Sequence, residues 1–286
     1  TTRADTMVDV TADAVGLSAL QTLKSVRASR SDGLALQLGA YSPLGFRDDQ
    51  PERWEIFEAG AKEADFIGIL PEADDVDDYP EHIGFSEHCQ RMLALACELD
   101  CMVHVHLDQR HEPSEDGTET LLEELENTGG YVAPDGSPRV WAVHMISPST
   151  YDEPRFQRLV DGLLAQRVGV ICCPSAALGM RQLRPLSTPT GNSIPRVLEL
   201  LAAGVPVRLA SDNIADLCSP STTADLADEV FILSAALRFY HCDILAKLAC
   251  GVPLTDADRG LVTAHLAENQ RAIEKVLHAR HSGMVE

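Results

Sequence analysis

The sequence predicts an α/β fold, a TIM-like (β/α)8 barrel of parallel strands whose first strand is missing from this chain. Two observations support this fold class. Apolar runs rich in Val, Ile and Leu recur along the chain with helical patterns between them, which is typical of βαβ units that build a parallel sheet. Four of these runs end on His, His, Ser and Asp, and in a parallel barrel the carboxyl ends of the strands meet at one mouth.

Seven apolar runs are expected to form the strands. They are Met7–Val10, Leu34–Ala40, Phe66–Leu70, Met102–Leu107, Val140–Val143, Val168–Cys173 and Val205–Ala210. A barrel of this type needs eight strands, and after Asp212 the chain has only helical patterns. We therefore expect the missing strand to belong before Thr1 or to come from another polypeptide. A seven-stranded open sheet is the alternative.

Helical patterns separate and follow the strands. They span Leu17–Arg27, Trp54–Glu63, Phe85–Leu99, Thr118–Asn127, Glu153–Gln166, Ser193–Ala203, Thr223–Tyr240, Cys242–Cys250 and Asp256–His278. Gly204 is expected to end one helix just before a strand, because glycine readily adopts the left-handed conformation of a helix cap. Since no repeat or low-complexity linker interrupts the series, we expect one barrel domain over residues 1–286 with a helical extension from residue 256.

Composition excludes several classes of function. The chain has 286 residues, 45% of them hydrophobic, and a formal net charge of −21, which argues against nucleic acid because phosphate binding needs a basic face. No apolar run approaches the roughly 18 residues of a membrane span. The first residues lack the basic and apolar regions of a signal peptide. The eight cysteines form no CxxC pair, so we interpret them as thiols of a reducing cytoplasm.

Two histidines share one strand. His104 and His106 alternate with apolar residues, so both are expected on the same side of their strand. This spacing can present two imidazoles to one metal ion, although a polar barrel interior can also hold a hydrogen-bonded histidine pair. His106, nearer the strand end, is the stronger ligand candidate. His104 fits a ligand role and a supporting structural role equally well.

The next strand ends mark further candidates. His144 ends the strand that follows His106, and Gln109 lies in the polar run just after His106, where a loop would line the mouth. Asp212 ends the last strand of the series. An Asp at a strand end is often only the cap of the next helix, but this position favours a metal-linked acid/base role.

From Thr6 to about Tyr240 the chain resembles the cytosine deaminase-like branch of the amidohydrolase superfamily. The motifs that carry the resemblance are Val8-Asp9-Val10, Val105–Asp108, the strand-end His144, the run 195–205 and Ser211-Asp212-Asn213. The resemblance implies a (β/α)8 barrel with one Zn²⁺ or Fe²⁺ that hydrolyses C–N bonds in cyclic or amide substrates. It implies that His106 and Asp212 bind the metal, that Asp212 also shuttles protons, and that His144 polarises substrate or bound water.

Three departures from the family pattern stand out. The family's first-strand His-x-His, which supplies two metal ligands, has no counterpart here. Gln109 replaces a glutamate that moves protons in cytosine-type deaminases, and glutamine cannot titrate. Pro43 replaces the pyrimidine-binding glutamine, which makes cytosine itself a poor substrate guess.

We therefore expect a metal-dependent hydrolase that cleaves the C–N bond of an amide, amidine or amino-heterocycle, a small-molecule substrate. Asp212 would move the proton of metal-bound water, His144 would stabilise the oxyanion and Gln109 would orient the substrate. Arg181 and Arg184 fit recognition of a carboxylate or carbonyl edge and fit solvated loop cations equally well.

Two other functions are alternatives to this hydrolase. The sequence is also compatible with a homo-oligomer. A catalytically inactive relative that binds a small molecule or a partner is supported by Gln109 and by the lack of first-strand ligands. A doubly wound nucleotide-binding protein is not supported, because no Gly-rich turn follows a strand.

Overall fold

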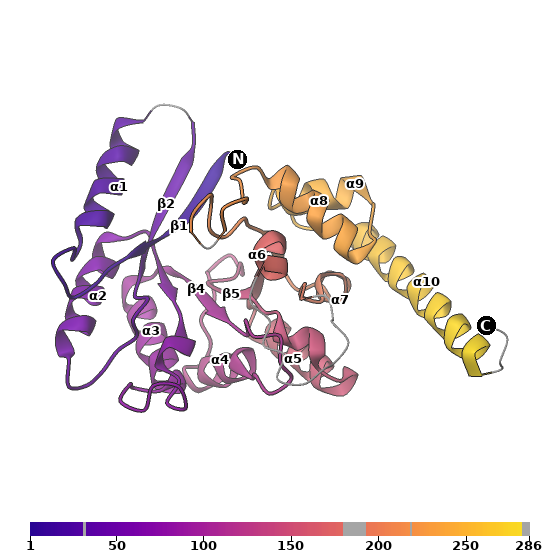
Figure 1. Cartoon of the computed structure of the whole chain (residues 1–286), viewed down its shortest axis with the longest axis horizontal. Coiled ribbons are helices and arrows are strands. Elements are labelled where there is room, and N and C mark those ends of the chain that lie inside the picture. The colour runs from indigo at the N-terminus through magenta and orange to yellow at the C-terminus, as the bar shows by residue number, and fades with distance from the viewer. Residues whose placement is uncertain (31–32, 180–192, 218, 282–286) are drawn as a thin grey trace.

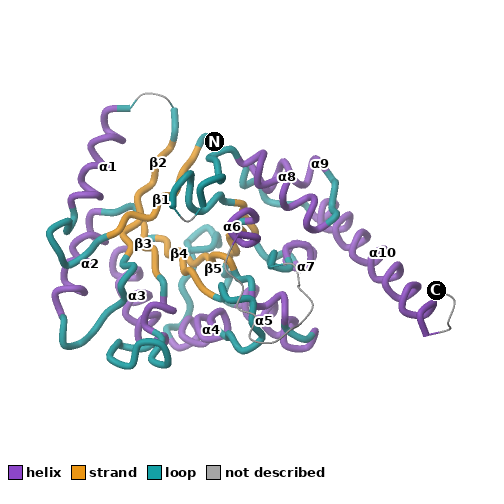
Figure 2. Tube along the Cα trace, viewed as in Figure 1, coloured by secondary structure: helices purple, strands orange, loops and turns teal. Residues whose placement is uncertain are grey.

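The computed structural model describes residues 1–30, 33–179, 193–217 and 219–281. The described chain is an α/β structure in which parallel strands curl into a half-barrel, with helices α1 to α5 arranged along its outer side (Figures 1 and 2). Its strands are β1 Arg3–Asp9, β2 Ala35–Tyr41, β3 Phe66–Ile69, β4 Met102–Leu107, β5 Val140–His144, β6 Gly169–Cys172 and β7 Val207–Leu209.

The strands lie in chain order, and each pairs in parallel with the next. The strands expected from the sequence are therefore confirmed, with small differences at their ends. In the described residues β1 and β7 do not pair with each other, so the sheet stays open between them. An additional first strand that would fill this opening stays a prediction.

The first strand is longer than its apolar run. It begins at Arg3 rather than Met7, because backbone pairing with β2 already starts at the partners Arg3 and Ala35. Arg3 and Asp5 point to the same side of this strand, and Nε of Arg3 lies 2.7 Å from the carboxylate of Asp5. Because these strand residues are polar and form an ion pair, the apolar pattern of the sequence does not show that the strand begins here.

Helices cover the outer side of the sheet. They are α1 Ser18–Ser29, α2 Pro51–Glu63, α3 Phe85–Leu99, α4 Gly117–Asn127 and α5 Glu153–Ala165, and the short helices α6 Pro174–Gly179 and α7 Val197–Ala203 come after β6. Short 3-10 turns follow β3 and β5, namely η1 Pro71–Asp74 and η2 Ser147–Thr150. The last helices are α8 Leu226–Leu237, α9 Cys242–Ala249 and α10 Asp256–His281, and α10 extends away from the barrel (Figure 1).

Among the described helices, α7 and α6 depart most from the sequence-based expectation. Helix α7 begins at Val197 rather than Ser193, because Pro195 disfavours helical geometry at Ile194 before it. Helix α6 was not expected, since it is a single short segment that begins at Pro174 directly after a strand. Among the helices described, none is both long and apolar enough to cross a membrane.

The alternation along β4 separates core from barrel interior. Val103, Val105 and Leu107 are fully buried in the main core cluster, which joins the sheet to its helices. His104 and His106 occupy the alternate positions and so face the barrel interior. The two histidines therefore lie on the same side of β4, and both imidazoles point away from the helix layer.

Candidate active site

Three strand ends have a left-handed backbone. The φ angle is 57° at Asp108, directly after β4, 74° at His144, the last residue of β5, and 61° at Asp212, in the loop that follows β7. Residues other than glycine rarely adopt such angles, and they concentrate at functional sites. Regular alternation would place His144 on the helix side with Ala142. The positive φ angle of His144 interrupts this alternation, and the centroid of the His144 ring lies 5.5 Å from that of the His106 ring.

His106 is held in one tautomer. Its Nδ1 lies 3.1 Å from the carbonyl oxygen of Ile69 and must therefore carry the proton that it donates. The pKa of His106 is lowered to about 4, mainly by burial and also by nearby His144, whereas the hydrogen bond to Ile69 and the charge of Asp212 act to raise it. The ring is neutral at neutral pH, which leaves the lone pair of Nε2 for a metal ion or a proton.

His144 is a second neutral imidazole beside His106. Its side chain is buried, and burial lowers its pKa to about 4. Within the described part of the chain its Nδ1 has no hydrogen-bond partner. A buried polar atom without a partner costs about 1–3 kcal/mol, so this nitrogen is a candidate contact for a bound molecule.

Asp212 lies close enough to act on His106. Burial raises the pKa of Asp212, while His106 and the backbone amide of Asn213 lower it. The charge of Asp212 in turn raises the pKa of His106. The structure thus brings His106, His144 and Asp212 to one end of the sheet.

His104 lies one pleat deeper in the barrel than His106. Its ring centroid is 4.7 Å from that of Phe66, and its side chain is only 4% exposed. Burial lowers its pKa to about 3, helped by His106, Arg208 and Arg3. These neighbours place His104 among interior groups below the mouth, next to a phenyl ring.

Gln109 is paired with a carboxyl group that sequence reasoning missed. Its Nε2 donates a hydrogen bond to Oε2 of Glu72, at 3.0 Å. The pKa of Glu72 is raised to about 8, mainly by burial and also by Glu115 and Asp108, whereas Arg110 acts to lower it. Glu72 lies in η1, just after β3. Applying the strand-end rule to the run Phe66–Leu70 would have found it.

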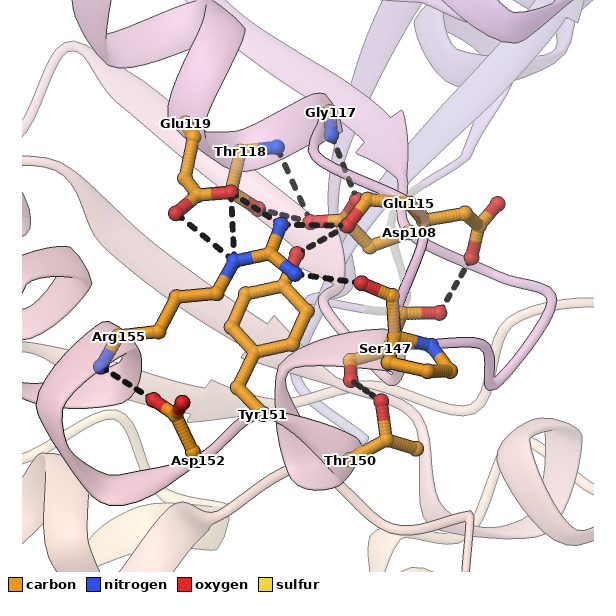
Figure 3. Close-up of polar contacts among 11 residues, drawn as sticks. Asp108, Glu115, Gly117, Thr118, Glu119, Ser147, Thr150, Tyr151, Asp152 and Arg155 are labelled. Carbon is orange, nitrogen blue, oxygen red and sulfur yellow. Dashed lines mark hydrogen bonds and ion pairs between the residues drawn. The ribbon is translucent and has the colours of Figure 1, made fainter.

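The loop that carries Gln109 is anchored by Asp108 (Figure 3). The buried carboxylate of Asp108 accepts hydrogen bonds from the backbone amides of Gly117 at 2.8 Å and Thr118 at 3.0 Å, and from the Thr118 hydroxyl. The Asp108 carbonyl accepts from the backbone amides of Ile146 and Ser147, each at 3.0 Å. The loops after β4 and β5 are therefore tied together, which fixes Gln109 relative to His144.

Arg155 of helix α5 also binds the loop that carries Gln109. Its guanidinium contacts the Glu119 carboxylate and donates a 3.0 Å hydrogen bond to the carbonyl oxygen of Glu115, while the Tyr151 hydroxyl donates to that same oxygen (Figure 3). The other two predicted substrate-binding residues, Arg181 and Arg184, lie outside the described residues.

The described residues supply too few ligands to complete a metal site. His106 offers Nε2, and Asp212 offers a carboxylate near it. Over residues 1–30, 33–179, 193–217 and 219–281, no group of three or more His, Cys, Asp or Glu side chains could hold a metal ion. Because a zinc site needs at least three protein ligands, these residues alone do not complete one.

Comparison with solved structures identifies the fold family. A 5-methylcytosine deaminase from Klebsiella pneumoniae, liganded with phosphonocytosine, matches with a TM-score of 0.73 and 25% identity, over 86% of this chain and 57% of that chain. An N-isopropylammelide isopropylaminohydrolase from Burkholderia multivorans matches with a TM-score of 0.64 and 21% identity, over 91% of this chain and 60% of that chain. The second match shows the fold alone.

Curated sequences give a consistent result. A pterin deaminase of Rhizobium rhizogenes is 23% identical over 225 residues, which cover 78% of this chain and 47% of the relative. An uncharacterized protein of Haemophilus influenzae is 29% identical over 154 residues, or 52% of each chain. No protein-family model matches the sequence. The chain spans about half the length of these curated relatives, and the neighbours confirm its resemblance to cytosine deaminase-like amidohydrolases.

Proposed function

We propose that this chain carries the strand-end site of a hydrolase that cleaves a C–N bond in a small heterocycle, amide or amidine. One observation carries the proposal. Two neutral imidazoles, His106 and His144, lie with ring centroids 5.5 Å apart at the same strand ends as Asp212. This is a set of groups suited to proton transfer and to stabilising an oxyanion.

Each residue has a distinct role in this proposal. Asp212 accepts a proton from the attacking water and delivers it to the leaving nitrogen, a task that its half-buried carboxylate supports. His144 donates a hydrogen bond to the oxyanion that forms at the attacked carbon. Gln109 orients the substrate from the loop anchored by Asp108. Arg181 and Arg184 are proposed to contact a carboxylate or carbonyl edge of the substrate.

A single divalent metal, zinc or else iron, is part of the proposal. His106 and Asp212 would supply two of its ligands, and His104 would be a third only if its ring moved toward the mouth from its place beside Phe66. Such an ion would lower the pKa of bound water. The described residues do not complete a metal site, and the roles given above are those of the chain's own side chains.

A substrate panel tests the proposal. The purified chain is supplied with Zn²⁺ and incubated with 5-methylcytosine, N-isopropylammelide or pterin, and release of ammonia or amine is measured. We expect turnover of one compound, and we expect none from the His144→Ala variant. The exposed-site variant Asp243→Asn on α9 serves as control and should match the unchanged chain.

A non-catalytic binding protein is the second candidate, favoured by the incomplete set of metal ligands among the residues that the structure describes. In that case the strand-end site would bind a small molecule without hydrolysing it. Binding of one of the three compounds without release of ammonia or amine, at any metal concentration, would favour this second function.

A further inference from the structure

The carboxyl group of Glu72 has one oxygen without a partner. Oε2 accepts the 3.0 Å hydrogen bond from Gln109, whereas Oε1 is shielded from solvent and has no hydrogen-bond partner in the described residues. Burying a carboxyl oxygen without a hydrogen-bond partner costs free energy. A hydrogen-bonding group of a bound ligand would supply the missing partner.

Glu72 belongs to the same end of the barrel as the catalytic candidates. It follows β3, whose last residue, Ile69, accepts the hydrogen bond from His106. The charges of Asp9, Asp212 and Glu72 all raise the pKa of Tyr41, after the larger effect of burial. The Tyr41 ring lies 5.6 Å from that of His106. One short segment, 69–72, therefore contacts both His106 and Gln109.

We propose that Glu72 is a specificity-determining residue that binds substrate as a neutral carboxylic acid and donates a hydrogen bond from Oε1 to an unprotonated ring nitrogen. This inference rests on the proposed function, which it deepens by naming the substrate class. While Glu72 Oε1–H donates to the ring nitrogen, the side-chain oxygen of Gln109, whose Nε2 is bound to Glu72, would accept from an adjacent exocyclic amine. The matching substrate is an amino-heterocycle in which the amine-bearing carbon adjoins a ring nitrogen.

The surroundings keep Glu72 neutral near pH 7. Burial has the largest effect on its pKa, which is about 8. Glu115 and Asp108 on the loop after β4 raise this pKa further through their negative charge, whereas the charge of Arg110 and a hydrogen bond from the backbone of Gln109, both on that loop, lower it. Because Gln109 already donates to Oε2, the acid proton resides on Oε1, the oxygen without a partner.

The first test follows the proton of Glu72 directly. The full chain is labelled with ¹³C at the glutamate side-chain carboxyl carbons and titrated by NMR. We expect one resonance with a midpoint near the pKa of about 8, absent from Glu72→Gln and present in the control Glu123→Gln, which changes an exposed residue of α4. If every glutamate resonance titrates below pH 6, the proposal is wrong.

The second test measures binding with 2-aminopyrimidine as the probe and aniline, which lacks the ring nitrogens, as its matched control. Affinity of the unchanged chain should fall about tenfold from pH 6 to pH 9, because a group with a pKa of about 8 is neutral in only about one molecule in eleven at pH 9. Glu72→Gln keeps a neutral donor and should bind equally at both pH values. Glu72→Leu should bind at least tenfold more weakly at pH 6, and aniline should show no such pattern.

The results of these tests distinguish a failure of the Glu72 inference from a failure of the proposed function. If 2-aminopyrimidine binds but neither Glu72 variant changes affinity or its pH dependence, the Glu72 inference fails and the proposed function stands. If the unchanged chain and all variants bind neither this probe nor the substrate panel, the proposed function itself fails, and the inference fails with it.

Discussion

At the scale of single residues, burial sets the chemistry of this site. His106 and His144 have pKa values lowered to about 4, so both are neutral at pH 7, and Glu72 has a pKa raised to about 8. Neutral imidazoles can accept protons or bind metal, and a neutral carboxyl can donate. His106, His144 and Glu72 therefore give the site neutral hydrogen-bonding groups of both kinds.

Gln109 is expected to act in substrate binding rather than in proton transfer, because its amide cannot titrate. In Gln109→Ala, KM should rise by more than kcat falls, measured by steady-state kinetics on the substrate found in the panel. The exposed Gln157→Ala on α5 provides the control. A fall in kcat with unchanged KM would assign Gln109 to the chemical step instead.

Glu72 makes stability depend on pH. In the unfolded chain its carboxyl ionises near its usual value of 4.5, but in the folded chain it keeps its proton up to about 8. Folding stability is therefore lost as pH rises from about 4.5 to 8. Glu72→Gln removes this loss, so it should change the free energy of unfolding little at pH 4.5 and stabilise the chain at pH 9, by about 1.4 kcal/mol for each pKa unit at most.

Urea unfolding at the two pH values measures this effect. The exposed variant Glu123→Gln should show no such difference between pH 4.5 and pH 9. An equal effect of Glu72→Gln at both pH values would mean that the carboxyl is not held neutral.

At the scale of elements, periodicity in the sequence predicts the strands and most helices well. Runs such as Met102–Leu107 alternate clearly, and their bounds match the structure. Positions set by tertiary contacts are harder to predict. The start of β1 at Arg3 depends on pairing with β2, and the role of Asp108 depends on amides nine and ten residues away in α4.

The anchor formed by Asp108 gives a prediction at this scale. Asp108→Ala leaves two buried backbone amides without their acceptor, which should cost about 1–3 kcal/mol for each lost partner. The loop that carries Gln109 should also loosen, so probe binding should weaken. Chemical denaturation and binding titration measure the two effects.

Asp152→Ala is the matched control. Asp152 caps α5 through the backbone amide of Arg155 at 2.8 Å, and its side chain is exposed. Its loss should cost about 1 kcal/mol without weakening binding. Unchanged binding in Asp108→Ala would contradict the link between the anchor and Gln109.

At the scale of the whole molecule, the sheet is a half-barrel that is open between β1 and β7. The strand-end rule predicts a site of His106, His144 and Asp212, because parallel strands in chain order bring their carboxyl ends together, and the roles of these residues stay a prediction. It could not show that His104 lies against Phe66 or that Glu72 holds Gln109, since both depend on how neighbouring strands pack.

The chain should hold metal poorly. With His106 and Asp212 as the two donors that the described residues bring together, we expect well under one equivalent of Zn²⁺ after dialysis, measured by elemental analysis. Stoichiometric, tightly held zinc that is lost in His104→Ala would contradict this expectation and would make His104 a ligand.

The most direct test of the central claim is a comparison of Asp212→Asn with the unchanged chain, both supplied with Zn²⁺ and assayed on the substrate found in the panel. Asp212 is the proton-transferring group of the proposed hydrolysis, so kcat should fall by about 10²–10⁴-fold or more, while folding and binding of 2-aminopyrimidine persist. Near-full activity of Asp212→Asn would contradict the assignment of C–N hydrolysis to this site.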